Sequence, residues 1–232
     1  MSYSKFTLES VREAFCLSIY EQQDLFADIQ PVCPSDLLTM ILDEYLSLAI
    51  DVNTEKARSE FIIAPILGDV RRQSNYEVSL FSGKEFDVDQ EQGLTGYCDF
   101  ILCLAKEQLY INAPVMTIVE AKNENIIGGL GQCIASMVAA QIFNKKNKSR
   151  KEDQADQQSQ NLSGLVNNST DEIYDAVTTG TNWRFIKLNN QTVLIDKTEY
   201  YIRDIEKILG ILMCPRTRQM EAIATKTFSP GG

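Results

Sequence analysis

The sequence predicts an α/β protein in which helices flank a central mixed β-sheet. Three observations support this fold class. Apolar residues recur at helical spacing early in the chain, most clearly over 34–50. The pattern then shortens to the period of strands at 76–82 and 96–104. Finally, 114–121 is a nearly continuous apolar run, which is typical of a central strand covered on both faces.

Length and composition indicate one globular domain. A chain of 232 residues with 44% hydrophobic and 23% charged residues can bury a sizeable core. No continuous apolar run approaches the roughly 18 residues of a membrane span. The N-terminus lacks the basic-then-apolar order of a signal peptide. We therefore expect a cytoplasmic protein with no membrane association.

The residue inventory excludes several kinds of active site. The chain has no histidine, which rules out Ser-His-Asp triads, Cys-His nucleophiles and the usual zinc sites. Its six cysteines are scattered without a Cys-x-x-Cys pair, and most lie in apolar surroundings typical of buried cysteine. A metal would have to be held by oxygen, which points to Mg²⁺ or Mn²⁺.

The charge balance is acidic. A net charge of −10 disfavours non-specific binding of nucleic acid, although a local basic patch can still bind phosphate. The segment 145–151, KKNKSRK, carries five positive charges in seven positions. A solvated helix end explains this segment as simply as a contact with nucleic acid does.

Helices dominate the first third of the chain. The apolar spacing predicts helices over 8–22 and 34–50, which together form an N-terminal extension over 1–52. Ser35 and Asp36 supply N-cap chemistry for the second helix. A further helix is predicted over 53–73, with Thr54 as its cap. Pro65 lies inside it, so we expect a kink or break near Ala64.

The remaining elements form the core, which we place at 53–145 and 171–213. The two strands at 76–82 and 96–104 form an antiparallel pair joined by an acidic loop, and 114–121 is the central strand. Residues 146–170 are polar and are expected to be a flexible insertion. The other predicted elements are a helix over 129–143, a hairpin of strands 183–188 and 192–195 across Asn189-Asn190-Gln191, and a closing helix over 200–213.

Charged residues interrupt two of the predicted strands. Glu120 and Lys122 end the apolar run at 114–121, and side chains two apart on a strand share a face. Asp99 interrupts the strand at 96–104, where an unpaired carboxylate is costly to bury. If the two strands are neighbours, the two acids can converge at one end of the sheet. Two carboxylates beside an ammonium form a site for a divalent metal and an activated water.

In this order and strand context, the residues resemble the PD-(D/E)XK nuclease superfamily, which has the restriction-endonuclease-like fold. The resemblance covers a little over half the chain, from about Glu60 to Trp183. The family core runs helix, three strands, helix, strand (α-β-β-β-α-β), with an acid on the second strand and Glu/Asp-x-Lys on the third. Here these acids and the lysine are Asp99, Glu120 and Lys122.

Softer matches and departures accompany this motif. Many members have a glutamate on the helix before the sheet, which Glu60 matches, and some have a glutamine early in the following helix, which Gln132 matches. The usual proline before the first acid is replaced by Cys98. The related Gln-x-x-x-Tyr pattern is incomplete, because Ser136 occupies the tyrosine position. The segment AVTTGTNWRFIKL also resembles nuclease domains of restriction enzymes.

The resemblance implies hydrolysis of phosphodiester bonds in nucleic acid, with DNA favoured over RNA. Asp99, Glu120 and the backbone carbonyl of Ala121 would hold Mg²⁺ or Mn²⁺, and Lys122 would stabilise charge in the transition state. Glu60 would contact the metal through water, and Gln132 would position substrate or Lys122. Restriction-type nucleases are frequently dimers, so a homodimer is also expected by analogy.

Other interpretations remain open at the level of sequence. Glu120 and Lys122 could be a solvated pair, Asp99 a structural partner of Lys122, and Glu60 and Gln132 ordinary helix positions. Asp87, Asp89 and Glu91 alternate like ligands of a calcium loop but fit a solvated turn better. For the whole chain, the alternatives are a nuclease-fold binding or assembly module that needs a protein partner, and a metal enzyme acting on a small phosphorylated molecule.

Overall fold

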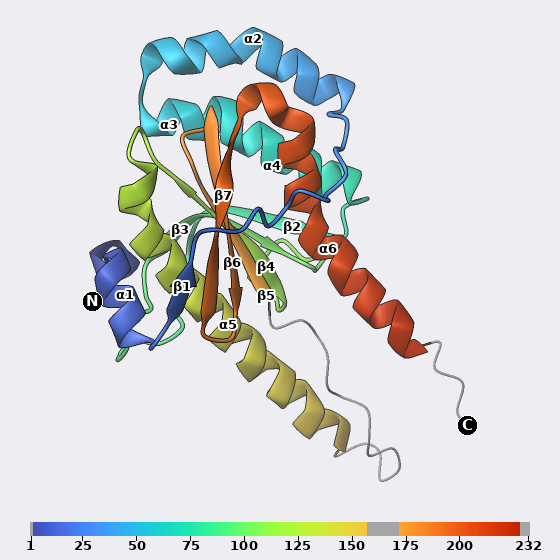
Figure 1. Ribbon diagram of the computed structural model, residues 1–232. Coiled ribbons are helices and arrows are strands. Elements are labelled where there is room, and N and C mark those ends of the chain that lie inside the picture. Colours follow the sequence, from blue (N-terminus) through green and yellow to red (C-terminus); the bar gives the residue numbers. More distant parts are fainter. Residues whose placement is uncertain (1, 157–171, 228–232) are drawn as a thin grey trace.

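The protein is an α/β fold built on one mixed sheet of seven strands, as predicted (Figure 1). The computed structural model describes residues 2–156 and 172–227. The strand order is β1-β7-β6-β5-β4-β3-β2. The strands are β1 (Ser18–Tyr20), β2 (Ser79–Glu85), β3 (Tyr97–Cys103), β4 (Val115–Ala121), β5 (Glu172–Thr178), β6 (Asn182–Asn189) and β7 (Thr192–Tyr201).

Helices cover both faces of the sheet. One hydrophobic cluster packs α1 and α5 on one face, and a second packs α4 and α6 on the other. Helix α2 lies outside α3 and α4, farther from the sheet (Figure 1). The helices are α1 (Leu8–Ala14), α2 (Asp36–Val52), α3 (Glu55–Arg58), α4 (Ala64–Gln73), α5 (Ile126–Asp156) and α6 (Ile205–Thr227), with short 3₁₀ turns at Tyr3–Lys5 and Ile202–Asp204.

The middle of the sheet combines an antiparallel meander with one parallel pair. Strands β2, β3 and β4 pair antiparallel in chain order. Helix α5 then crosses over the sheet and leads into β5, which pairs parallel with β4. A parallel neighbour requires such a crossover, and its helix covers the sheet face. This connection places the start of α5 next to the end of β4.

Local signals in the first helices are confirmed. The side chain of Ser35 accepts a hydrogen bond from the amide of Leu38, and Thr54 accepts one from Ala57, so both residues cap helices as predicted. Helices α3 and α4 are joined by a π-helical turn at Ser59–Ile63, directly before Pro65. The irregularity expected near Ala64 is therefore present as a widened turn.

Several predicted boundaries are wrong. The helix predicted over 8–22 ends at Ala14, because Cys16 adopts a left-handed backbone (φ 52°) and the chain then forms β1. Strand β2 begins at Ser79, since Tyr76 also has positive φ. Strand β5 was not predicted, and Tyr200 belongs to β7 rather than to the closing helix. The hairpin of β6 and β7 is confirmed, and it turns through Asn190 at φ 51°.

Helix α5 differs most from its prediction over 129–143. It extends to Asp156, so the first part of the expected insertion is helical and 157–170 lie outside the described residues. Lysine, glutamate and glutamine favour helix, which explains this extension. The span Ile126–Ser149 is also long and apolar enough to cross a membrane, but 72% of its most apolar window is buried inside the protein. It is a core helix.

Candidate active site

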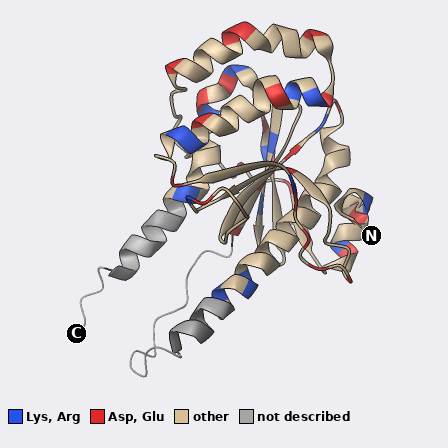
Figure 2. Cartoon of the chain, turned by 180° about the vertical axis from the view of Figure 1, so that it is seen from behind, with Lys and Arg blue, Asp and Glu red and all other residues tan. Residues whose placement is uncertain are grey.

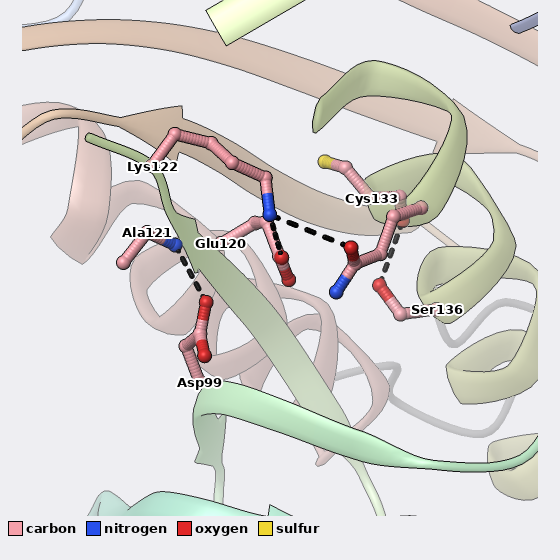
Figure 3. A network of polar contacts seen from close by, with 7 residues as sticks. Asp99, Glu120, Ala121, Lys122, Cys133 and Ser136 are labelled. Atoms are coloured by element: carbon pink, nitrogen blue, oxygen red, sulfur yellow. Dashed lines mark hydrogen bonds and ion pairs between the residues drawn. The ribbon is translucent and has the colours of Figure 1, made fainter. Parts of the chain in front are cut away.

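The candidate site lies at the end of the sheet where β3 begins and β4 ends (Figure 3). The last pair in their register is Phe100 with Val119, so the next positions along the strands are Asp99 and Glu120. There the amide of Ala121 donates to Oδ2 of Asp99 at 2.8 Å. The carboxylate of Asp99 thus accepts the hydrogen bond that a backbone carbonyl would accept in a continued ladder. This contact holds Asp99 against the end of β4.

The side chain of Lys122 joins β4 to α5. Its Nζ donates to Oε1 of Glu120 at 2.6 Å and to Oε1 of Gln132 at 3.4 Å (Figure 3). Its backbone amide donates to the carbonyl of Thr178 on β5 at 2.8 Å. The backbone of Lys122 is therefore held by β5, and its ammonium is held by Glu120 and Gln132. The structure brings together Asp99, Glu120, Ala121, Lys122 and Gln132, five positions expected from the sequence.

Burial alters the acidity of both carboxyl groups. The side chain of Glu120 is 3% exposed, and its burial raises the pKa to about 7, with the nearby charge of Asp99 adding to the rise and Lys122 opposing it. Burial also raises the pKa of Asp99, whereas the Ala121 amide and Lys122 lower it. Near neutral pH, Glu120 is therefore close to the point where it exchanges a proton.

Lys122 remains a cation. Burial lowers the pKa of its ammonium, but the carboxylate of Glu120 raises it, and the net pKa lies above the ordinary value of lysine. The side chain is 23% exposed, so part of it reaches solvent. A fixed ammonium in this position can stabilise negative charge on a substrate but cannot serve as a base at neutral pH.

Gly129 leaves the space that Lys122 occupies. A Cβ on Gly129 would lie 3.0 Å from Cε of Lys122 and 2.9 Å from Cγ1 of Val177, both closer than ordinary contact. Any larger residue here would displace the lysine from beneath α5 or push the helix off β5. The sequence shows Gly129 only as half of a Gly-Gly break before a helix, so its role was missed.

The two glutamates of the preceding helical segment have different surroundings. Glu60 forms a surface ion pair with Lys56 at 2.7 Å, and its side chain is 53% exposed. Glu55, in the first turn of α3, is the acid whose charge reaches the site: it contributes to raising the pKa of both Glu120 and Lys122. The structure thus brings Glu55 rather than Glu60 towards the site. The N-cap signal at Thr54 was the available clue to where this helix begins.

A further acid, Asp175, lies buried beneath the site. It pairs in register with Ile118, two positions before Glu120, and is 0% exposed. Among the described residues, neither of its carboxyl oxygens has a hydrogen-bond partner of good geometry. Burial raises its pKa well above the ordinary range and the charge of Glu120 adds to the rise, whereas the Cys133 thiol, the Ala176 amide and the Ser136 hydroxyl oppose it. Because β5 was not predicted, this acid was missed.

The oxygen atoms at the site are of the kind that hold a hard divalent cation in proteins. No group of three histidine, cysteine or acidic side chains comes together in the described parts of the chain. The donors are instead two carboxyls, Asp99 and Glu120, and the backbone carbonyl of Ala121. Mg²⁺ is commonly held by one or two carboxylates, with water and substrate phosphate as its remaining ligands. The donor set therefore suits Mg²⁺ or Mn²⁺ in the presence of a phosphate ester.

The acidic loop before β3 is structural. Oδ1 of Asp87 accepts a hydrogen bond from the amide of Gly96, and Oδ1 of Asp89 accepts one from the amide of Gln92. Asp89 closes a local turn and Asp87 links the two ends of the loop, so backbone hydrogen bonds account for both acids, as the solvated-turn interpretation expects.

The chain matches no protein-family model, no curated protein and no solved structure. The chemistry of the site therefore has to be argued from its own geometry.

Proposed function

We propose that this protein is a metal-dependent nuclease with a PD-(D/E)XK-type site, which hydrolyses phosphodiester bonds in nucleic acid, with DNA as the favoured substrate. The observation that carries the proposal is the convergence of Asp99, Glu120 and Lys122 at one end of the sheet. The order α4, β2, β3, β4, α5, β5, with β5 parallel to β4, supports a restriction-endonuclease-like core. We place this activity in the cytoplasm.

Asp99, Glu120 and the carbonyl of Ala121 would hold the metal. A bound Mg²⁺ or Mn²⁺ would polarise the scissile phosphate and lower the pKa of an attacking water. The net charge of the site is consistent with a bound divalent cation. Two carboxylates against one ammonium would repel a phosphate, and a divalent cation reverses that sign. Glu55 adds negative charge near the site.

Lys122 and Gln132 would act on the substrate side of the metal. The ammonium of Lys122 is positioned by Glu120 and Gln132 before any substrate binds. Such a preorganised cation stabilises charge that develops on the phosphoryl oxygens without further rearrangement. Gln132 would keep Lys122 in place when a metal ion draws Glu120 away from it.

The alternative function is a nuclease-fold module that binds or assembles with a partner without cleaving. One observation favours it: the ion pair between Glu120 and Lys122 is short, and a metal must compete with it. The basic residues Lys145, Lys146 and Lys148 also lie about 20 Å along α5 from Gln132, not beside the site (Figure 2). For the nuclease function, by contrast, a homodimer would place one active site against each strand of a DNA duplex.

The proposal is tested by incubating supercoiled plasmid and single-stranded DNA with Mg²⁺ or Mn²⁺. The wild type is compared with Glu120→Gln, which is nearly isosteric, and with Glu60→Gln as a matched control at an exposed acid. Cleavage by the wild type and by Glu60→Gln, with loss in Glu120→Gln, is the expected result. Cleavage by all three would mean a different site or a contaminant. Metal binding without cleavage by any would favour the binding module.

A further inference from the structure

Helix α2 carries a row of exposed apolar side chains beside the stripe that packs on the protein. Its inner stripe, which packs on the helices beneath, consists of Leu38, Leu42, Leu46 and Ala49. A different set of large apolar side chains on the same helix is exposed: Leu37, Met40, Tyr45, Leu48, Ile50 and Val52. These make up six of the thirteen large apolar side chains left exposed in the described parts of the chain.

Half of the exposed set lies along one line. Leu37, Leu48 and Val52 are spaced i, i+11 and i+15, which places them along one side of the helix. Tyr45 does not belong to this row, because its ring stacks on Phe61 in the π turn, with the ring centroids 5.4 Å apart. Met40, 68% exposed, flanks this line. We call these four residues, Leu37, Met40, Leu48 and Val52, the outer stripe. Isolated exposed apolar side chains are ordinary, but a row of them along a whole helix marks an interaction surface.

The charges beside the outer stripe have one sign. Asp36, Asp43, Glu44 and Asp51 are the charged residues of α2, and the helix has no lysine or arginine (Figure 2). Charged side chains that flank an apolar contact select partners by complementarity. The surface therefore presents an apolar row bordered by carboxylates.

The acidic residues beside the outer stripe favour some binding partners over others. A second copy of the chain packed on the same stripe would bring two acidic borders together, and like charges disfavour that contact. An anionic lipid surface or a nucleic acid would be repelled by the same carboxylates. A helix with one apolar face and lysine or arginine beside it fits both features.

We propose that the outer stripe of α2 is a docking surface for an amphipathic, basic helix of a partner protein. The apolar face of that helix would cover Leu37, Leu48 and Val52, and its cations would pair with the carboxylates of Asp43 and Glu44. Helix α2 contacts α3 and the π turn, on the side of the molecule from which Glu55 reaches the site. The surface does not depend on the proposed nuclease activity.

The test uses a defined probe. A fluorescent synthetic peptide of about the length of α2, with leucines on one helical face and lysines beside them, is titrated with the full chain. A peptide with glutamate in place of each lysine is the charge control. The protein variants are Met40→Ser with Leu48→Ser in the outer stripe, and Leu109→Ser as a matched control, because Leu109 is 86% exposed on another part of the surface.

The expected result is saturable binding of the lysine peptide alone, weakened about tenfold or more by the double variant and unchanged by Leu109→Ser. Asp43→Asn with Glu44→Gln should weaken it as well, and added salt should reduce it. Equal binding of the two peptides, or no effect of the double variant, would overturn the proposal. A dimer in solution that the double variant dissociates would assign the stripe to a second copy instead.

Discussion

In the proposed mechanism, the carboxyl of Glu120 has two competing partners, the ammonium of Lys122, which it contacts in the structure, and the metal ion that it would bind. Because Glu120 is almost completely buried, its carboxylate is stable only when a positive charge, either the ammonium or a metal ion, lies beside it. A proton is the third competitor, since the pKa of Glu120 is raised to about 7. Occupancy of the site by metal should therefore vary over the physiological pH range.

We predict that Mn²⁺ affinity falls as pH is lowered through 7. The group is an acid with a raised pKa, so it is ionised above that value and protonated below it. At pH 6 protons should weaken binding about tenfold relative to the plateau above pH 8. Titration calorimetry across this range measures the effect. An affinity that stays flat from pH 6 to pH 8, with the fold intact by circular dichroism, would remove Glu120 from the ligand set.

A second prediction separates Lys122 from metal binding. Lys122→Ala should retain Mn²⁺ binding, because it removes no oxygen ligand, and should reduce DNA cleavage about a hundredfold or more by removing a preorganised cation. Lys84→Ala, at an exposed lysine on β2, is the control and should cleave normally. Cleavage by Lys122→Ala at the rate of the control would exclude Lys122 from the chemistry.

At the scale of elements, what could be predicted depended on how local the determinants are. Helix α2, strands β3 and β4 and the β6–β7 hairpin follow from nearby residues: caps, apolar spacing and a turn at Asn190. Strand β1 has only three residues and exists because β7 lies beside it. Strand β5 is covered on both faces and contains Asp175, so it lacks a regular polar alternation. Neither strand has a local signal strong enough to be read.

The same distinction holds for the site. Asp99, Glu120 and Lys122 could be found because charges interrupt apolar strands, and strand periodicity gives their faces. Which glutamate reaches the site depends on how the segment from α3 to α4 packs, and a π turn shifts that packing. Glu55 and Gly129 are therefore visible only once α3 and α5 are placed against the sheet.

Two glycine substitutions test the packing of α5 over Lys122. Gly129→Ala should lower cleavage by displacing Lys122, because its Cβ would lie 3.0 Å from Cε. Gly68→Ala in α4 is the matched control, since no heavy atom lies within 4 Å of its Cβ. That control should keep activity and gain about 0.5–1 kcal/mol in the free energy of unfolding from helix propensity. Full activity in a folded Gly129→Ala would contradict the account of α5.

At the scale of the whole molecule, the site lies next to a buried acid that has no ion-pair partner in the described parts of the chain. Asp175 is buried between the sheet and α5 and belongs to no ion pair described in the structure. Such a group is retained at a cost, because the folded state must either hold a proton or bury a charge. It is the clearest place where stability of the fold and pH are linked.

We predict that Asp175→Asn flattens the pH dependence of stability. The folded wild type keeps a proton that the unfolded chain releases above pH about 4, so unfolding free energy falls as pH rises towards the raised pKa. The asparagine variant lacks this linkage. In urea unfolding at pH 5 and pH 8, the free energy of unfolding of the variant relative to that of the wild type should rise with pH by up to about 1.4 kcal/mol per pH unit. Parallel pH curves would mean that Asp175 is ionised and stabilised in the fold.

The most direct test of the central claim is the position of a bound metal. A crystal grown with Mn²⁺ and measured at a wavelength where manganese scatters anomalously locates the ion without reference to activity. The account predicts an anomalous peak between the carboxyls of Asp99 and Glu120 and the carbonyl of Ala121, lost in Glu120→Gln. A peak elsewhere, or none at a concentration that saturates binding in solution, would contradict the assignment of this site as a metal-dependent nuclease centre.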